Sequence, residues 1–192
     1  MEQSGYQDFI ENIPSDILNV TYNDNKVIDG NILTPTLTNI FPNIILNNKD
    51  EDGLYTLIMT DPDAPSRSNP SFREFIHYVC INIKGNDIKT GQEIASYIGP
   101  APPYNSGLHR YYFVVYKQTS KIDSELAIEY YKNRGGLKSN QWCITNKCEM
   151  AHSWTMFQSE WDISCDATHE AIGFVPPPTY RSPKQIEKHG NA

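Results

Sequence analysis

The pattern of apolar and polar positions predicts a chain built mainly from β-strands. Residues 54–59 form a short apolar run, and residues 74–83 and 109–116 form longer runs rich in β-branched and aromatic side chains. Runs that are apolar on both faces are typical of central strands, because both faces of such a sheet are covered. The other β-prone stretches, several of them bounded by Asn, Asp and Gly residues, are 17–22, 27–28, 31–34, 44–46 and 153–161.

Helices are expected to be few and short. The segments with helical character are residues 6–12, 124–133 and 141–149. The run Val-Pro-Pro-Pro that begins at Val175 cannot lie inside a helix or a central strand, so residues 163–192 are expected to form an appended, partly irregular tail. Many short strands with few helices predict a mainly β domain of two packed sheets over residues 1–162, followed by this tail.

The composition narrows the class of protein. The 192 residues suit one domain with or without a tail, and a hydrophobic content of 39% is typical of a globular chain. Lys and Arg number 16 against 23 Asp and Glu, which gives a formal net charge of −7. Nucleic-acid binding and electrostatic adsorption to an anionic membrane both need a basic surface, so neither is expected, although peripheral contact with a membrane remains open.

The expected compartment follows from segments that the sequence lacks. No apolar stretch is long enough to cross a membrane, and the first 15 residues carry no apolar run typical of a secretory signal. The four cysteines are therefore expected to be reduced thiols in a cytoplasmic protein. The sequence predicts no metal site and no cofactor, because Cys143 and Cys148 lack the paired spacing of a zinc site.

Two polar residues stand out beside the predicted strands. Asp61 follows the run 54–59 directly, within a proline-rich turn. His77 lies on the more apolar side of the run 74–83 if side chains alternate regularly, together with Val79 and Ile81. Each has an ordinary structural explanation, since an Asp in a turn accepts backbone N–H groups and a lone buried His is often only hydrogen-bonded.

A third polar group begins the strand predicted at 109–116. His109 and Tyr111 are two residues apart and therefore share one face, whereas Arg110 points to the other face, as a structural ion-pair partner. Two imidazoles, one phenol and a rigid Pro/Gly loop provide donors suited to an anion such as phosphate or sulfate. Asp61 then has two candidate roles: it orients a His, or it meets the cationic end of a zwitterion such as phosphoethanolamine.

Two long motifs resemble the signatures of the phosphatidylethanolamine-binding protein family, which includes the Raf kinase inhibitor proteins. The first is LYTLIMTDPDAPSRSNPSFREFIHYVCINIKGNDI, and the second is GPAPPYNSGLHRYYFVVYKQ. They occur in the family's order and at a similar separation, and the resemblance covers about residues 17–162. It implies a large central antiparallel sheet packed against a smaller sheet, with a few short peripheral helices.

The resemblance also implies a small pocket for anions or phospholipid headgroups. The residues that match its ligand contacts are Asp61, His77, His109 and Tyr111. The residues that match its walls are Pro62, Pro65, Phe75, Ala101, Pro102 and Pro103. Three further motif residues, assigned to holding the loops, are Asp63, Arg67 and Arg110. Several family members close the pocket with a C-terminal helix that supplies another aromatic contact; residues 163–192 do not visibly match it, and Tyr180 is the candidate for that contact.

The resemblance favours a non-enzymatic binding protein and signalling modulator. Its implied partners are a phosphate-type anion or a phosphatidylethanolamine headgroup, and protein kinases. Two alternatives remain open. One is a hydrolase that uses Asp61 and the two histidines; Ser106 has no base at an obvious spacing, and no G-x-S-x-G motif is present. The other is a protease inhibitor that uses residues 1–12 as an inserting arm.

Overall fold

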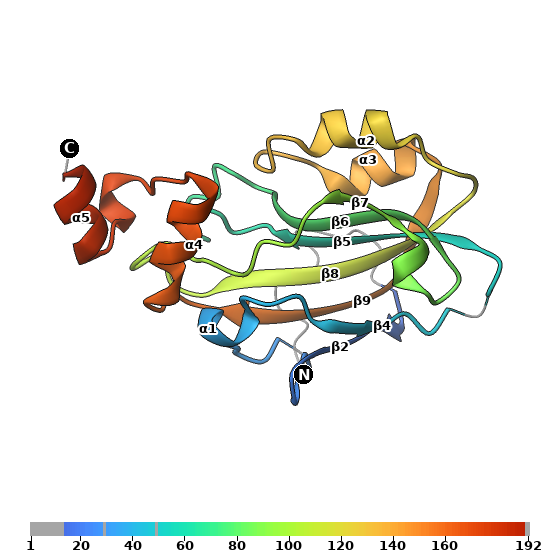
Figure 1. Cartoon of the computed structure of the whole chain (residues 1–192), viewed down its shortest axis with the longest axis horizontal. Helices are drawn as coiled ribbons and strands as arrows, with labels where there is room; N and C mark the ends of the chain where they lie inside the picture. Colours follow the sequence, from blue (N-terminus) through green and yellow to red (C-terminus); the bar gives the residue numbers. More distant parts are fainter. Residues whose placement is uncertain (1–13, 29, 49, 191–192) are drawn as a thin grey trace.

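A six-stranded sheet runs through the middle of the molecule (Figure 1). The computed structural model describes residues 14–28, 30–48 and 50–190 of the chain. In spatial order the strands of the large sheet are β1 (Asp16–Ile17), β9 (Cys148–Ser159), β8 (His109–Gln118), β5 (Leu54–Asp61), β6 (Phe75–Lys84) and β7 (Gln92–Ala95). β1 pairs parallel with β9, and the other neighbours pair antiparallel.

A smaller antiparallel sheet packs against one face of the large sheet. Its strands, in spatial order, are β3 (Asn25–Lys26), β2 (Asn19–Tyr22) and β4 (Asn43–Ile45). The helices are short: α1 (Pro35–Thr38), η1 (Ile88–Thr90), α2 (Ser124–Tyr131), α3 (Ser139–Thr145), α4 (Ser164–Ile172), η2 (Pro178–Tyr180) and α5 (Pro183–His189). The predicted fold, a mainly β molecule with a large and a smaller sheet and short peripheral helices, is confirmed.

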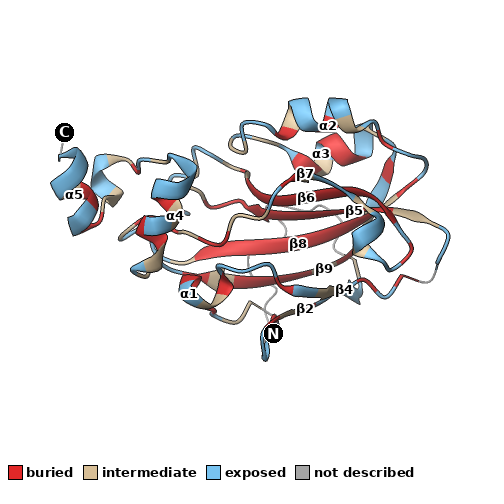
Figure 2. Cartoon of the chain, in the orientation of Figure 1, coloured by how far each residue is buried: buried red, intermediate tan, exposed pale blue. Residues whose placement is uncertain are grey.

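Both faces of the large sheet are covered, which explains why its central strands are apolar on both sides (Figure 2). One core lies between the two sheets, where Met59 and Phe113 meet Val20 and Tyr22. The other lies under α2 and α3, where their side chains pack on Ile58, Val79 and Val114. Successive side chains along a strand point alternately into the two cores. The face to which a residue at the end of a strand points is therefore set by the residues before it.

Several local predictions near the N-terminus were wrong. Residues 31–34 were expected to form a strand, but they contribute only an isolated bridge between Ile32 and Gln158. The helix α1 follows, because Thr34 caps it by accepting the Leu37 N–H at 3.3 Å and Pro35 suits its first position. The second strand of the small sheet is Asn25–Lys26 rather than residues 27–28. The helix predicted at residues 6–12 lies outside the described residues.

Later boundaries also differ. β7 was not predicted; it pairs with β6 at the edge of the large sheet. The helix predicted at 141–149 ends at Thr145, because β9 begins at Cys148 and pairs with Gln118 of β8. The last strand was predicted at residues 153–161, whereas β9 starts earlier, at Cys148, and ends two residues earlier, at Ser159.

Side chains were expected to alternate regularly along β6, and this was wrong. The alternation breaks at His77. β6 pairs Tyr78 with Met59 but Ile76 with Thr60, so His77 has no partner residue on β5. Val79 and Ile81 enter the core under the helices, whereas His77 makes an edge-to-face contact with Tyr111, on the opposite side of the sheet. A β-bulge redirects side chains in this way.

The segment predicted as a partly irregular tail is largely helical. α4 ends at Ile172 and is followed by Gly173, which adopts the left-handed conformation (φ 68°) that favours glycine, and α5 begins with a capping box between Ser182 and Gln185. Buried side chains connect the two helices: the Ser182 hydroxyl donates to Asp166 Oδ2 at 2.6 Å, and Gln185 Nε2 lies 2.9 Å from His169 Nδ1. The predicted break at the proline run is real, since residues 174–177 carry neither helix nor strand.

Candidate functional site

A cavity of about 200 Å³ opens at one end of the large sheet. β5 ends there, and β6 and β8 begin there, because neighbouring antiparallel strands alternate in direction. α4 and the residues after it lie at the same end of the molecule (Figure 1). The cavity therefore has a floor of strand ends and a wall supplied by the C-terminal segment.

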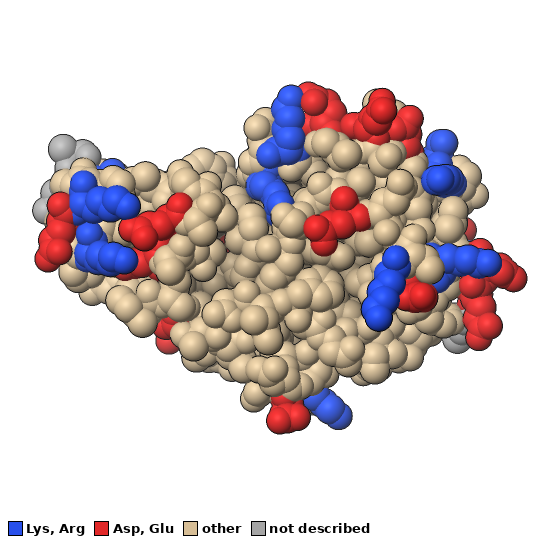
Figure 3. Space-filling view, in the orientation of Figure 1, with Lys and Arg blue, Asp and Glu red and all other residues tan. Residues whose placement is uncertain are grey.

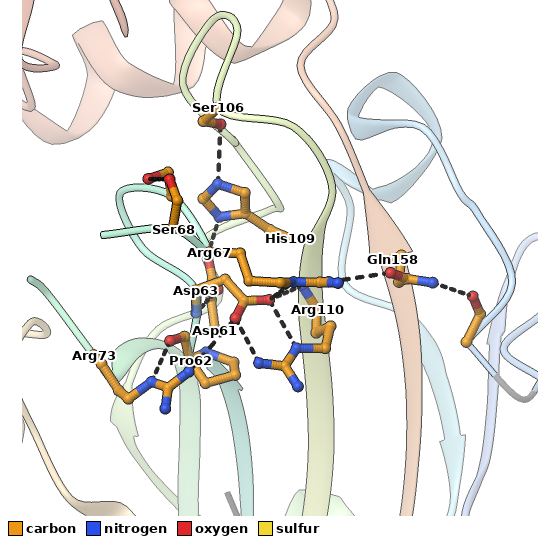
Figure 4. A network of polar contacts seen from close by, with 12 residues as sticks. Asp61, Pro62, Asp63, Arg67, Ser68, Arg73, Ser106, His109, Arg110 and Gln158 are labelled. Atoms are coloured by element: carbon orange, nitrogen blue, oxygen red, sulfur yellow. Dashed lines mark hydrogen bonds and ion pairs between the residues drawn. The ribbon is translucent and has the colours of Figure 1, made fainter. Parts of the chain in front are cut away.

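The floor is polar and is built around a buried contact between two strands. His109 Nδ1 lies 2.7 Å from Asp61 Oδ2 (Figure 4). The other carboxylate oxygen of Asp61 accepts the Asp63 N–H at 2.7 Å. Both oxygens are thus engaged by the protein, and this favours the role in which Asp61 orients His109 over the role in which it meets a ligand's cationic end.

His77 reaches the cavity from the bulge in β6. Its Nδ1 lies 2.8 Å from the Ile98 carbonyl oxygen, and its backbone carbonyl accepts the Ile98 N–H at 2.9 Å. The ring packs edge-to-face against Phe75 and Tyr111. Burial lowers the pKa of His77 to about 4, so the ring is neutral at physiological pH.

Tyr111 is the other polar residue of the floor. The side chain is fully buried and lines the cavity, and the hydroxyl has no hydrogen-bond partner within the described part of the chain. Burial raises the pKa of Tyr111 well above its usual value, so the phenol keeps its proton. A buried donor without a partner is costly unless something occupies the space before it.

Ser106 lies beside an imidazole, which its sequence spacing did not predict. Its Oγ lies 2.9 Å from His109 Nε2. Because Nδ1 of the same ring contacts Asp61, the three side chains form one continuous chain of polar contacts. The same hydroxyl donates to the Pro103 carbonyl oxygen at 2.7 Å, and Ser106 does not line the cavity. A hydroxyl carries one proton, and here it points to the Pro103 carbonyl rather than to the imidazole, so the geometry does not show general-base activation of Ser106.

A separate ion-pair cluster holds the strand ends in place (Figure 4). The buried Asp63 carboxylate accepts Arg110 Nε at 2.8 Å, Arg110 Nη2 at 2.6 Å and Arg67 Nε at 3.2 Å. Arg73 approaches it at 3.7 Å and donates to the Pro62 carbonyl oxygen at 2.6 Å. Arg110 holds the pKa of Asp63 below its usual value despite burial. None of these four charged side chains lines the cavity.

Most of the predicted site residues come together around the cavity. Those that line it are Asp61, Pro65, Phe75, His77, Ala101, Pro103, His109 and Tyr111. Pro62 and Pro102 were predicted as walls and do not line it. Sequence reasoning missed Ala64, Phe72, Ile98, Asn133, Gly135, His169, Ile172 and Phe174. The position of Phe72 inside the first motif was a usable signal; those of His169 and Phe174 were not, because only the folded chain brings them here.

The aromatic contact from the C-terminal segment is Phe174, not Tyr180. Phe174 packs edge-to-face on Phe72 at a centroid distance of 6.2 Å and on His169 at 5.1 Å. The Tyr180 hydroxyl instead donates to Ser66 Oγ at 2.9 Å, outside the cavity. His169 Nε2 lies 2.9 Å from the Ala101 carbonyl oxygen, so α4 is bonded directly to the loop that forms the opposite wall.

The electrostatics of the cavity differ from those of a cationic anion site. Among the described residues no Lys or Arg lines the cavity, and its upper walls are apolar, from Phe72, Ile98 and Phe174. Within residues 14–28, 30–48 and 50–190 no group of three His, Cys, Asp or Glu side chains is placed to hold a metal ion. Within the same ranges no helix has the length and apolar character needed to cross a membrane.

Comparison with known proteins identifies this architecture. The model of the family described as phosphatidylethanolamine-binding protein matches residues 23–157. The chain is 35% identical over 159 residues to the putative odorant-binding protein A5 of Drosophila melanogaster, covering 81% of this chain and 75% of that one.

Two solved structures have the same fold. The carboxypeptidase Y inhibitor, crystallised in complex with its cognate proteinase, has a TM-score of 0.62 at 29% identity, covering 78% of this chain and 85% of that one. The phosphatidylethanolamine-binding protein of Plasmodium vivax has a TM-score of 0.64 at 25% identity, covering 79% and 89%. These relatives are described as binding or inhibitory proteins. The chain belongs to the phosphatidylethanolamine-binding protein family.

Proposed function

We propose that the chain is a non-enzymatic binding protein that takes one phosphate-type headgroup at a time into the cavity. The observation that carries the proposal is the Tyr111 hydroxyl, a fully buried donor at the cavity floor without a partner among the described residues. A ligand oxygen placed before it would satisfy this donor. The family, whose description names a phospholipid, supports a headgroup as the source of that oxygen.

The shape and charge of the cavity support a small amphiphilic ligand. At about 200 Å³ it is smaller than the roughly 300–1,000 Å³ of a typical pocket for drug-sized molecules. Its polar floor and aromatic upper walls suit a polar group that carries an organic substituent, such as phosphoethanolamine or a lipid headgroup. On the face that Figure 3 shows, Lys and Arg are interleaved with Asp and Glu, an arrangement that favours one buried headgroup over adsorption to an anionic bilayer.

Nuclear magnetic resonance titration tests the proposal. We expect inorganic phosphate and phosphoethanolamine at pH 6 to shift the signals of His77 and Tyr111. The variant Tyr111→Phe should weaken binding about 2- to 10-fold, the range expected for one hydrogen bond. Tyr131→Phe is the matched control, because the Tyr131 hydroxyl is also buried without a partner in the described residues but lies in the core under α2. Absence of shifts, or equal effects of the two variants, would reject the proposal.

The regulatory part of the proposal concerns the partners. We propose that the ligand-bound protein acts as a signalling modulator, with protein kinases as the partner class that the family resemblance implies. Binding of a purified kinase domain, with and without phosphoethanolamine, tests this part separately from headgroup binding. A kinase that neither binds nor changes in activity would remove it and leave the pocket function intact.

Protease inhibition is a second candidate, favoured by the structural similarity to the carboxypeptidase Y inhibitor. Residues 1–12, the arm considered for this role, lie outside the described residues. Inhibition of carboxypeptidase Y by the full chain, compared with a chain that begins at residue 13, separates the two candidates. Equal failure of both chains to inhibit would remove this one.

A further inference from the structure

The hydrogen bonds of His77 determine which of its nitrogens carries the proton. Nδ1 lies 2.8 Å from the Ile98 carbonyl oxygen, and a carbonyl oxygen only accepts. Nδ1 therefore holds the hydrogen. In the neutral ring Nε2 then has a free lone pair and can only accept. In the described residues Nδ1 is the only ring nitrogen of His77 with a protein partner, so Nε2 remains for a ligand in the cavity that the ring lines.

The groups around His77 keep this ring neutral in the empty pocket. Asp61 at the end of β5 favours the charged form, whereas Arg134 after α2 and His109 on β8 disfavour it. Arg134 bonds to the backbone carbonyls of Ile76 and His77 at 3.3 and 3.4 Å. Tyr111 on β8 and His169 on α4 also face the cavity. Burial outweighs the attraction of Asp61, and the pKa of His77 falls to about 4.

A neutral His77 is a poor match for an anion. Its Nε2 lone pair would face the lone pairs of a phosphate oxygen, and Tyr111 alone would donate from the floor. A proton between Nε2 and the ligand oxygen changes this repulsion into a charge-assisted hydrogen bond, which is shorter and stronger than a neutral one. The loop that holds Nδ1 is unaffected, because the imidazolium still donates to Ile98.

We infer that the pocket binds its phosphate-type ligand together with one proton, which is held between Nε2 of His77 and an oxygen of the ligand. The inference rests on the proposed headgroup function and adds its regulation by pH. One N–H bond forms at Nε2, and its proton comes from the solvent, or from the ligand where the ligand carries a P–OH. Binding then weakens as the pH rises, because the protein alone has little affinity for that proton.

The source of the proton depends on the chemistry of the ligand. A phosphomonoester can bring its own P–OH, since its second pKa lies near ~6. Sulfate and the phosphodiester glycerophosphoethanolamine carry no such proton near neutral pH, so for these two probes it must be taken up from solvent. Only the diester carries an ammonium and a glycerol group. If both probes take up the same number of protons, the uptake is therefore coupled to the anionic oxygen that they share.

Isothermal titration calorimetry with these two probes tests the inference. Titrations at pH 5, 6, 7 and 8, each in buffers with different ionisation enthalpies, measure the protons taken up per ligand. We expect close to one proton at pH 7, and an affinity that falls about tenfold per pH unit between the pKa of His77 in the empty pocket, about 4, and the pKa of the bound complex, above which the affinity levels off. The ¹⁵N shifts of His77 should change from the Nδ1–H tautomer to the imidazolium on binding.

Two variants make the assignment specific. His77→Gln places an uncharged amide donor near the position of Nε2, so it should bind the probes with an affinity that is nearly constant from pH 5 to 8. His152→Gln is the matched control, since His152 packs on Tyr55 and does not line the cavity; it should behave as the wild type. Proton uptake that persists in His77→Gln would place the proton on another group and overturn the inference.

The outcomes also separate this inference from the function on which it rests. Binding with no proton uptake and a flat pH profile in the wild type would overturn the inference while the headgroup function stands. No binding of either probe at any pH would overturn both.

Discussion

His109 Nδ1 lies 2.7 Å from Asp61 Oδ2, and this buried contact joins the start of β8 to the end of β5. The two residues are 48 positions apart in the chain, yet their strands are neighbours in the sheet. Each strand directs its side chain to the same face, so both contribute to the cavity floor. The contact therefore has two structural effects. It joins two strands of the sheet, and it fixes the position of the His109 ring at the cavity.

Replacing Asp61 should show how much the contact with His109 stabilises the fold. Asp61→Ala leaves the buried His109 N–H without an acceptor and should lower the free energy of unfolding by about 1–3 kcal/mol. Asp61→Asn retains an oxygen of similar reach and should cost less. Urea denaturation followed by fluorescence measures both variants. Equal losses for Ala and Asn would show that the hydrogen bond to His109 is not what stabilises the strand ends.

Removing Arg110 should be more damaging than removing Arg67. Arg110 is buried and makes two side-chain bonds to Asp63, so Arg110→Met leaves a buried carboxylate with much less compensation and should cost about 3–5 kcal/mol. The side chain of Arg67 is 47% exposed, and Arg67→Met should cost less than about 1 kcal/mol. Thermal or urea unfolding compares the two at pH 7. A similar cost for both would contradict the assigned role of Arg110.

Glu74 should make stability depend on pH near neutrality. Its buried carboxyl accepts the Ser139 N–H at 2.9 Å and the Thr60 hydroxyl at 3.3 Å, and burial raises its pKa from 4.5 to about 7. The folded state therefore holds a proton that the unfolded state releases between these two pH values. Stability should fall as the pH rises through this window, by about 3 kcal/mol in total.

The variant Glu74→Gln isolates this effect, because an amide does not titrate. Its stability relative to the wild type should increase between pH 5 and pH 8, measured by urea denaturation at each pH. Glu149→Gln, an exposed residue at the start of β9, serves as the control and should show no such trend. A constant difference between Glu74→Gln and the wild type would mean that Glu74 is not the titrating group.

Acid should loosen the C-terminal helices. The bond of His169 Nε2 to the Ala101 carbonyl leaves Nδ1 to accept from Gln185 at 2.9 Å, which only the neutral ring can do. Burial lowers the pKa of His169, so this docking is stable above its ordinary value of about 6.5 and is lost as the pH falls.

Hydrogen exchange at pH 5 and pH 7.5, corrected for intrinsic rates, measures this loosening. Amides of α5 should exchange faster at pH 5 in the wild type. In Gln185→Ala they should exchange fast at both pH values, whereas Glu187→Ala, which changes an exposed side chain on the same helix, should match the wild type. Equal protection of the α5 amides in the wild type at both pH values would argue against His169 as the residue that holds α5 in place.

The large sheet was predictable because the runs that became β5, β6 and β8 are apolar on both faces. Burial on both sides leaves such a run few alternatives to a central strand. The shared face of His109 and Tyr111 followed from their spacing of two residues. β7 escaped prediction because an edge strand of four residues carries too little apolar pattern, and it becomes a strand only by pairing with β6.

By itself, the sequence determined the mainly β architecture, the two motif segments and the strand ends that carry Asp61, His109 and Tyr111. These depend on local patterns of apolar side chains and turn residues. The tertiary structure alone decided the side to which His77 points, the imidazole beside Ser106 and the closure of the pocket by Phe174 and His169. A bulge exists only relative to a neighbouring strand, and a short helix such as α4 gains most of its stability from the surface it packs on, so neither is encoded in one stretch of chain.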